Sequence, residues 1–292
     1  EAIPEELLAT VPSLINQIER DVTKLYNETF DDEEIIEYRI PDFHNRDHWF
    51  ERHVQEELAV ILAHIEDVPD RDLADFLNVC VSSIVVKVSN QDSDTRYAAT
   101  GTDAGARDTF DAFKVATLDN LQGLRELNRR AGSTRVDIFE QDARELRFLD
   151  DDQVDLIVTS PPYANTYDYY LYHKMRMFWL GFDFKEAQES EIGSRYRYSS
   201  QKEDPTTYFD NLTSSLEEMQ RVLRPGGVAV FIIGDSVIRG EFIRMDRTIE
   251  RICQGLSLDI TNRIQQELST FTSFNKSFGS QDKREYILFL EH

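Results

Sequence analysis

The chain has 292 residues, a formal net charge of -23 and 40% hydrophobic residues. This length and apolar content suit one large domain or two smaller ones with a sizeable core. No apolar run approaches the roughly 20 residues that a membrane span needs, and no secretory leader is evident, so we expect no membrane association. Two distant cysteines, Cys80 and Cys253, exclude a disulfide scaffold and indicate the cytoplasm.

The acidic charge is unevenly distributed along the chain. Lysine is scarce, with 8 Lys against 24 Arg, and this acidic, lysine-poor composition resembles that of proteins adapted to concentrated salt. Residues 1–158 carry a net charge of -20, whereas residues 159–202 carry +1. Because an acidic surface repels phosphates, a nucleic acid would contact the neutral segment 159–202.

The first part of the chain has helical periodicity. Apolar residues recur at helical spacing over 5–29, where Pro12 marks a break or a first turn, and again over 48–66. A helix is predicted over 73–88, although Val79–Val88 has enough β-branched residues for a strand. The polar stretch 89–104 is predicted as a loop, and 106–130 as a helix that ends at Gly132.

After Gly132 strands alternate with helices. We predict strands at Arg135–Glu140, Val154–Val158, Val228–Ile233, Leu258–Glu267 and Tyr286–Leu290, with helices at 206–224 and 243–255. This order predicts an α/β fold with a mostly parallel, Rossmann-like sheet. We therefore expect a mainly helical segment over 1–130 and an α/β domain over 131–292.

The strongest chemical feature is Thr159-Ser160-Pro161-Pro162-Tyr163, which directly follows the strand VDLIV. Ligands of open α/β sheets bind at the carboxyl ends of strands. Two prolines fix the backbone, so Ser160 and nearby carbonyls form a rigid group of acceptors beside an aromatic ring. Such acceptors can take the N–H bonds of an exocyclic amine while it attacks a methyl sulfonium, and a tyrosine can stack on an extruded base.

TSPPYANTYDYY, EIGSR and RVLRPGGVAVFIIGDS together resemble the S-adenosylmethionine-dependent amino methyltransferases of DNA. The resemblance covers about residues 135–290 and implies a methyltransferase sheet with an antiparallel last strand. It also implies that Ser160, Pro161, Pro162 and Tyr163 are catalytic, and that Asp142 and Ser160 contact S-adenosylmethionine. The Ser-Pro-Pro-Tyr form favours cytosine N4 over adenine N6, in the setting of DNA methylation and restriction–modification. Asp142 could instead cap a helix.

One element of the family is missing from the sequence. The Gly-rich loop that binds the methionine part of the cofactor is absent, and its nearest approximation is Thr100–Gly105. The resemblance therefore implies a carboxyl-terminal half whose Gly-rich part is cut away or supplied by a separate polypeptide. No metal site is predicted.

Aromatic rings with interleaved cations suit an unpaired base, and they gather after the motif. From this segment and the preceding polar loop we expect five nucleic-acid contacts: Tyr167, Lys174, Arg195, Arg197 and Arg96. Asp235 could face the same cleft or cap a helix.

Two alternatives stay open beside DNA methylation: an RNA methyltransferase acting on guanine N2, and a non-catalytic subunit of a divided methyltransferase.

Overall fold

The computed structural model describes residues 3–27, 39–94, 96–100, 105, 108–131, 134–267 and 282–292. Its contacts divide the chain into two units, the first formed by Glu1–Asp137 with Tyr170–Glu189 and the second by Ile138–Tyr169 with Ser190–His292. None of the described helices is long and apolar enough to cross a membrane. The segment Tyr170–Glu189 thus follows the Ser-Pro-Pro-Tyr motif in sequence but packs with the first unit.

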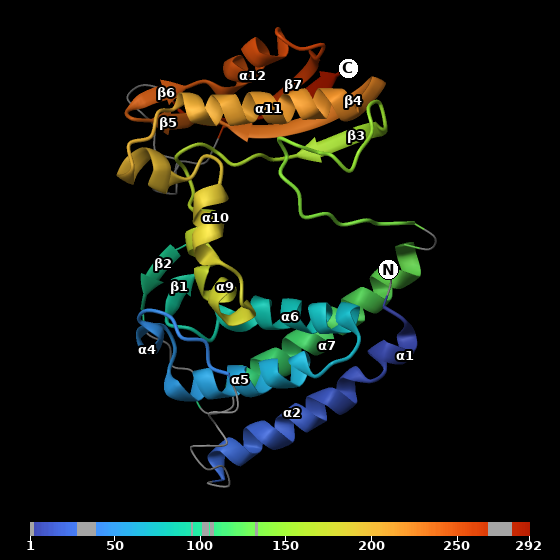
Figure 1. Ribbon diagram of the computed structural model, residues 1–292, viewed down its shortest axis with the longest axis vertical. Coiled ribbons are helices and arrows are strands. Elements are labelled where there is room, and N and C mark those ends of the chain that lie inside the picture. The colour runs from blue at the N-terminus through green and yellow to red at the C-terminus, as the bar shows by residue number, and fades with distance from the viewer. Residues whose placement is uncertain are drawn as a thin grey trace. The chain divides into compact units, whose positions relative to one another are not determined.

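The first unit is mainly helical (Figure 1). Four longer helices pack against one another through the apolar faces that their periodicity predicted. Pro12 lies in the first turn of the first of them, α2 (Val11–Tyr26), where its missing N–H costs nothing. The unit contains α1 (Glu5–Leu8), α2 (Val11–Tyr26), α4 (Arg46–Trp49), α5 (Arg52–Glu66), α6 (Arg71–Val85), α7 (Asp108–Ala131), α9 (Lys174–Leu180) and most of α8 (Tyr169–Tyr172) and α10 (Phe184–Ser190).

The helix predicted over 73–88 is confirmed, and its strand alternative at Val79–Val88 is wrong, because α6 continues to Val85 and buries its apolar face against α7. One other prediction in this unit is wrong. The predicted loop 89–104 contains a hairpin of β1 (Gln91–Ser93) and β2 (Arg96–Ala99), whose backbone groups pair although its side chains are polar. Gly132, the predicted end of the long helix, lies outside the described residues.

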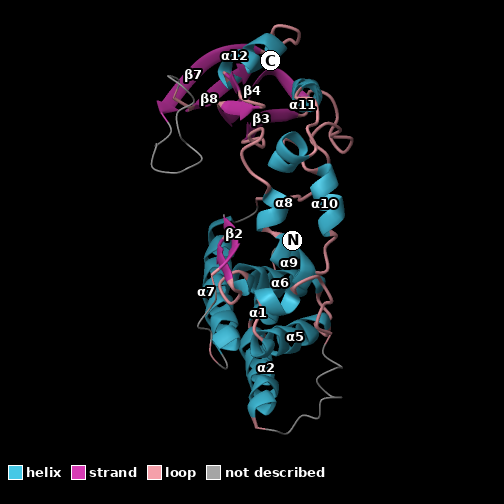
Figure 2. Ribbon diagram, turned by 90° about the vertical axis from the view of Figure 1, so that its left-hand side faces the viewer, coloured by secondary structure: helices cyan, strands magenta, loops and turns pink. Residues whose placement is uncertain are grey.

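The second unit is built on a four-stranded mixed sheet, drawn in magenta in Figure 2. The strand order is β3-β4-β8-β7, with β3 parallel to β4 and β8 antiparallel to both of its neighbours. The predicted antiparallel last strand is therefore confirmed. The elements are β3 (Val154–Thr159), η1 (Tyr196–Ser200), α11 (Thr206–Val222), β4 (Leu223–Gly234), β5 (Ser236–Ile238), β6 (Glu241–Ile243), α12 (Met245–Cys253), β7 (Asp259–Glu267) and β8 (Arg284–Glu291).

Helices α11 and α12 cover one face of this sheet. Ala229, Phe231 and Ile233 alternate along β4 and are fully buried on this face, together with apolar residues of both helices and of β8. The Pro-Gly-Gly turn forms the irregular start of β4, where Gly226 has a φ of +76° that favours glycine. The sheet thus fixes the carboxyl end of β3, from which the Ser-Pro-Pro-Tyr motif emerges.

The predicted strand Arg135–Glu140 is wrong. These residues form no regular secondary structure and pair with no strand of the described chain. Their alternating apolar residues, Val136 and Ile138, are 69% and 92% exposed. A strand needs a neighbour to satisfy its backbone groups, and within the described residues this segment has none.

Candidate active site

The Ser-Pro-Pro-Tyr motif leaves the carboxyl end of β3 as an irregular segment. Ser160 is exposed, whereas the side chains of Pro161, Pro162 and Tyr163 are partly buried. The Tyr208 hydroxyl of α11 donates to the Pro162 carbonyl at 3.0 Å. Helix α11 therefore anchors the motif through this hydrogen bond. The Ser160 side chain remains accessible to a ligand.

Tyr163 is fixed at both ends of its side chain. Its hydroxyl donates to Glu285 Oε1 of β8 at 2.5 Å, and its ring lies against the Cα of Gly234 at the end of β4. A Cβ on Gly234 would lie 2.7 Å from the ring, so no larger residue fits there without displacement. Burial, followed by the bond to Glu285, raises the pKa of Tyr163, which therefore stays neutral. The Tyr163 side chain is thus held in place, and its neutral hydroxyl donates a hydrogen bond to Glu285.

An open cavity of about 760 Å³ is lined in part by Asn165, which follows Tyr163 by two residues in the sequence. Asn165 shapes it by donating to the Val237 carbonyl at 2.7 Å and accepting from the Ser199 hydroxyl at 3.0 Å. The Arg239 guanidinium donates to the Glu203 carbonyl at 2.7 Å and adds positive charge beside Lys202. The cavity is lined by Asn165, Tyr198, Ser199, Lys202, Val237, Arg239 and Gly240.

Lys202 and Arg239 were missed in the sequence. They lie in the loops after η1 and between β5 and β6, where both have positive φ values, of 53° and 50°. The sequence carries no signal for such conformations at Lys and Arg, since glycine and asparagine usually occupy them. Their joint position gives the cavity the charge that a phosphate requires.

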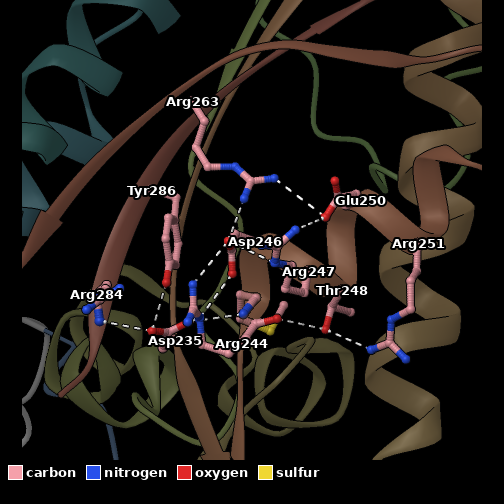
Figure 3. Close-up of polar contacts among 11 residues, drawn as sticks. Asp235, Arg244, Asp246, Arg247, Thr248, Glu250, Arg251, Arg263, Arg284 and Tyr286 are labelled. Carbon is pink, nitrogen blue, oxygen red and sulfur yellow. Dashed lines mark hydrogen bonds and ion pairs between the residues drawn. The ribbon is translucent and has the colours of Figure 1, made fainter. Parts of the chain in front are cut away.

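Asp235 follows β4 and is the centre of a buried polar network (Figure 3). Its carboxylate accepts from the Met245 and Arg284 backbone amides and from the Tyr286 hydroxyl, each at 3.1 Å. Asp235 is not the N-cap residue of α12, which is Arg244, but its carboxylate accepts from the first amide of that helix, the amide of Met245. Burial raises the pKa of this carboxyl despite the three donors.

The network extends to a second buried carboxylate, that of Asp246. Arg263 of β7 donates to Asp246 at 2.7 Å, and Arg244 donates at 3.2 Å (Figure 3). The bonds connect the end of β4, the middle of β7 and the start of β8 with α12.

Asp142 lies in the second unit, in the irregular segment before β3. Its carboxylate is exposed and accepts from the Arg144 side chain, which also donates to Asn211 of α11 at 2.6 Å. The bond to Arg144 lowers the pKa of Asp142, so the group is ionised at neutral pH. An exposed carboxylate held in this way is an acceptor suited to an amino group.

The five predicted nucleic-acid contacts are divided between the units. Tyr167 and Arg195 lie together in the second unit, since the Arg195 amide donates to the Tyr167 carbonyl at 3.3 Å. Arg197 belongs to the same unit, where it pairs with Glu203 at 3.0 Å and donates to the Glu191 carbonyl.

Lys174 and Arg96 belong to the first unit. The Lys174 ammonium lies 4.6 Å from the centroid of the Phe184 ring, and Arg96 lies on β2. Tyr167, Arg195 and Arg197 therefore belong to the same unit as the Ser-Pro-Pro-Tyr motif.

Some of these residues are hydrogen-bond acceptors of the kind that S-adenosylmethionine, the cofactor implied by the resemblance, would require. Asp142 and Ser160 are accessible acceptors, which fits the adenosine end of S-adenosylmethionine. No Gly-rich loop follows a strand in the part of the chain that the structure describes, and most of Thr100–Gly105 lies outside it. Within the described ranges no group of His, Cys, Asp and Glu side chains is placed to hold a metal ion.

The second unit is an α/β unit, in which the motif follows β3 and the helix α11 leads into the parallel strand β4 of the mixed sheet. Residues 154–292 match the model of a family described as DNA methylase. This part of the chain is similar to the DNA amino methyltransferases, which confirms the resemblance predicted from its motifs.

Solved structures of a DNA modification methylase from Thermus thermophilus are also similar to the chain. One is 25% identical, with a TM-score of 0.32, and covers 52% of this chain and 51% of that one. A second, complexed with S-adenosyl-L-methionine, is 24% identical with the same TM-score and covers 51% and 52%. The chain thus spans about half the length of the structures it matches. No curated protein matches the chain.

Proposed function

We propose that this chain carries the catalytic half of a DNA methyltransferase that modifies the exocyclic amino group of cytosine at N4. The observation that supports this proposal is the Ser-Pro-Pro-Tyr motif at the carboxyl end of β3, with Tyr163 fixed between Gly234 and Glu285. Two basic side chains, Lys202 and Arg239, line the cavity that Asn165 also lines. The family match over 154–292 supports methyl transfer to DNA. Adenine N6 is the other amine that this class of site accepts.

The residues of the motif have separate tasks in this proposal. The Ser160 hydroxyl and the neighbouring carbonyls accept the two N–H bonds of the amine, which frees the nitrogen lone pair for attack. Tyr163 and Tyr167 contact the extruded base, whose unstacking removes it from the duplex. Lys202 and Arg239, with Arg195, bind phosphates that flank the base.

S-adenosylmethionine is the cofactor we propose, because it supplies an electrophilic methyl group on its sulfonium when bound. Asp142 would accept from the adenine amino group, and Ser160 would contribute its hydroxyl to cofactor binding. The groups for the methionine end would come from a Gly-rich polypeptide outside the described residues. The cytoplasm, where DNA is accessible, is the compartment that fits this function.

The test is methyl incorporation from labelled cofactor in molar salt, with the chain alone and with a Gly-rich partner polypeptide. Nucleoside digestion of the DNA product should give N4-methylcytosine. Ser160→Ala should lower the rate by about 100-fold or more, as loss of a transition-state hydrogen bond does. The control is Ser215→Ala, which removes only a hydroxyl bonded to the Asn211 carbonyl within α11.

Other outcomes separate the alternatives. Methyl incorporation into RNA and not DNA would establish the guanine-N2 activity, since the same acceptors suit any exocyclic amine. An active assembly that tolerates Ser160→Ala would assign this chain to a non-catalytic subunit.

A further inference from the structure

The cavity that Asn165, Lys202 and Arg239 line is larger than phosphate contacts alone require. Its volume is about 760 Å³, within the range of roughly 300–1,000 Å³ that sites for small organic molecules occupy. None of the described residues that line it belongs to the Ser-Pro-Pro-Tyr motif. A base in contact with Ser160 would therefore not be held by the walls of this cavity, which leaves the cavity for another part of a bound nucleic acid.

One wall of the cavity has hydrogen bonds of fixed direction. The Asn165 side chain donates to the Val237 carbonyl at 2.7 Å, which fixes the orientation of its amide group. The carbonyl oxygen of the same side chain accepts from the Ser199 hydroxyl at 3.0 Å. Because the single hydroxyl proton of Ser199 is committed to Asn165, the Ser199 oxygen can only accept a hydrogen bond from a ligand. This wall therefore suits an amino group and disfavours a carbonyl oxygen.

A second wall carries positive charge on two constrained loops. Arg239 and Gly240, with φ values of 50° and 82°, form the two-residue turn between β5 and β6, as in a type I′ hairpin. The Arg239 guanidinium donates to the Lys202 and Glu203 carbonyls, and so links this hairpin to the loop after η1. A left-handed backbone is unfavourable for arginine and for lysine, yet here it brings both cations to one cavity.

The cavity is close in the chain to the tyrosine of the motif. Asn165 follows Tyr163 by two residues, which limits the separation of their Cα atoms to about 7 Å. A base held by Tyr163 and a group held by Asn165 would therefore be neighbours along one strand of nucleic acid. The buried Tyr198 and the partly buried Val237 add apolar surface to the same cavity. The cavity thus combines an acceptor, apolar surface and two cations.

We propose that this cavity binds the nucleotide adjacent to the target base, and that Ser199 selects a neighbour whose base carries an exocyclic amino group. Such a nucleotide offers an amine to the Ser199 oxygen, a ring to the apolar surface and a phosphate to Lys202 and Arg239. A base with a carbonyl in place of the amine would put its oxygen against that of Ser199 with no proton between them. The inference rests on the proposed action on DNA, but nucleotide binding is measured without methyl transfer.

The experiment is calorimetric titration of the full chain with dCMP, dUMP and inorganic phosphate, in the absence of cofactor. The uracil base has a carbonyl where cytosine has its amine, so the comparison of the two nucleotides isolates the contact with Ser199. We expect dCMP to bind about tenfold more tightly than dUMP, as one additional hydrogen bond to a matched acceptor gives. Inorganic phosphate should bind more weakly than either nucleotide, because it fills only the basic part of the cavity.

Variants locate the binding. Ser199→Ala removes the acceptor and should reduce the affinity for dCMP to that for dUMP. Ser199 is exposed, so the chain should still fold. Ser200→Ala is the matched control, because Ser200 is the next residue of η1, is equally exposed and does not line the cavity, and the preference for dCMP should remain. Lys202→Ala should weaken the binding of all three ligands by a similar factor, since each carries a phosphate.

Three results would overturn the proposal. Equal affinity of the unmodified chain for dCMP and dUMP, or no binding of either up to millimolar concentration, would remove the selective site. Inorganic phosphate that binds as tightly as dCMP would reduce the cavity to a site for anions. A preference for dCMP that is lost in Ser160→Ala and kept in Ser199→Ala would place the nucleotide at the motif. Intact selectivity without methyl transfer by any assembly would instead support the cavity and contradict the proposed function.

Discussion

Gly234→Ala should displace Tyr163 and so disable the site indirectly, through the position of the tyrosine ring. The added Cβ would lie 2.7 Å from Cε2 and 3.0 Å from Cδ2 of the ring. Carbon atoms in contact are about 3.5–4.0 Å apart, so the ring must move by roughly 1 Å. It cannot do so freely, because Glu285 holds its hydroxyl at 2.5 Å. Overpacking of this kind costs about 1–3 kcal/mol of unfolding free energy.

The effect on rate should be larger than the effect on stability. A displacement of about 1 Å in a reacting group can cost about 100-fold in rate, so we expect that loss in single-turnover methylation of DNA. Urea unfolding measures the stability change in parallel. Gly123→Ala is the control, since a Cβ there meets nothing within 4 Å and alanine suits the interior of α7. A Gly234→Ala protein with the unfolding free energy and rate of the wild type would refute the packing argument.

Two further predictions concern the charged groups of the second unit. Asp235→Asn replaces an acceptor of three hydrogen bonds and should lower the unfolding free energy by about 2–4 kcal/mol. Because burial raises the pKa of Asp235, the folded state holds this proton more tightly than the unfolded state. The wild type should therefore gain stability relative to Asp235→Asn as the pH falls toward 3.8, the ordinary pKa of an aspartate, and a pH-independent difference in urea titrations would contradict the shift. Lys202→Ala and Arg239→Ala should each weaken DNA binding about tenfold and reduce the salt slope of log K by about 1, as fluorescence anisotropy would show. An unchanged slope would exclude phosphate contact.

Local patterns predicted most of the regular elements. The period of apolar residues located α5, α11 and β8, because each buries one continuous stripe or face. Residue patterns failed where pairing partners decide the outcome. The segment 135–140 has strand composition and no described neighbour, and the polar residues of β1 and β2 form a hairpin through their backbones.

The candidate site was predictable only in part for a related reason. Ser160–Tyr163 could be recognised because it is contiguous and follows a strand. The contact of Tyr163 with Glu285 spans 122 residues, and the network of Asp235 joins three strands and α12. Such contacts follow from the order of strands in the sheet, which no single segment encodes.

The position of β8 has a consequence for synthesis of the protein. Among the described strands β8 is the last to leave the ribosome, yet it lies between β4 and β7 and carries Glu285, the partner of Tyr163. Until it is inserted, β7 has no neighbour in the sheet and the tyrosine of the motif has no anchor. Nascent chains that stop short of β8 would therefore lack an ordered candidate site, so that the methylation we propose would depend on completed translation of this unit.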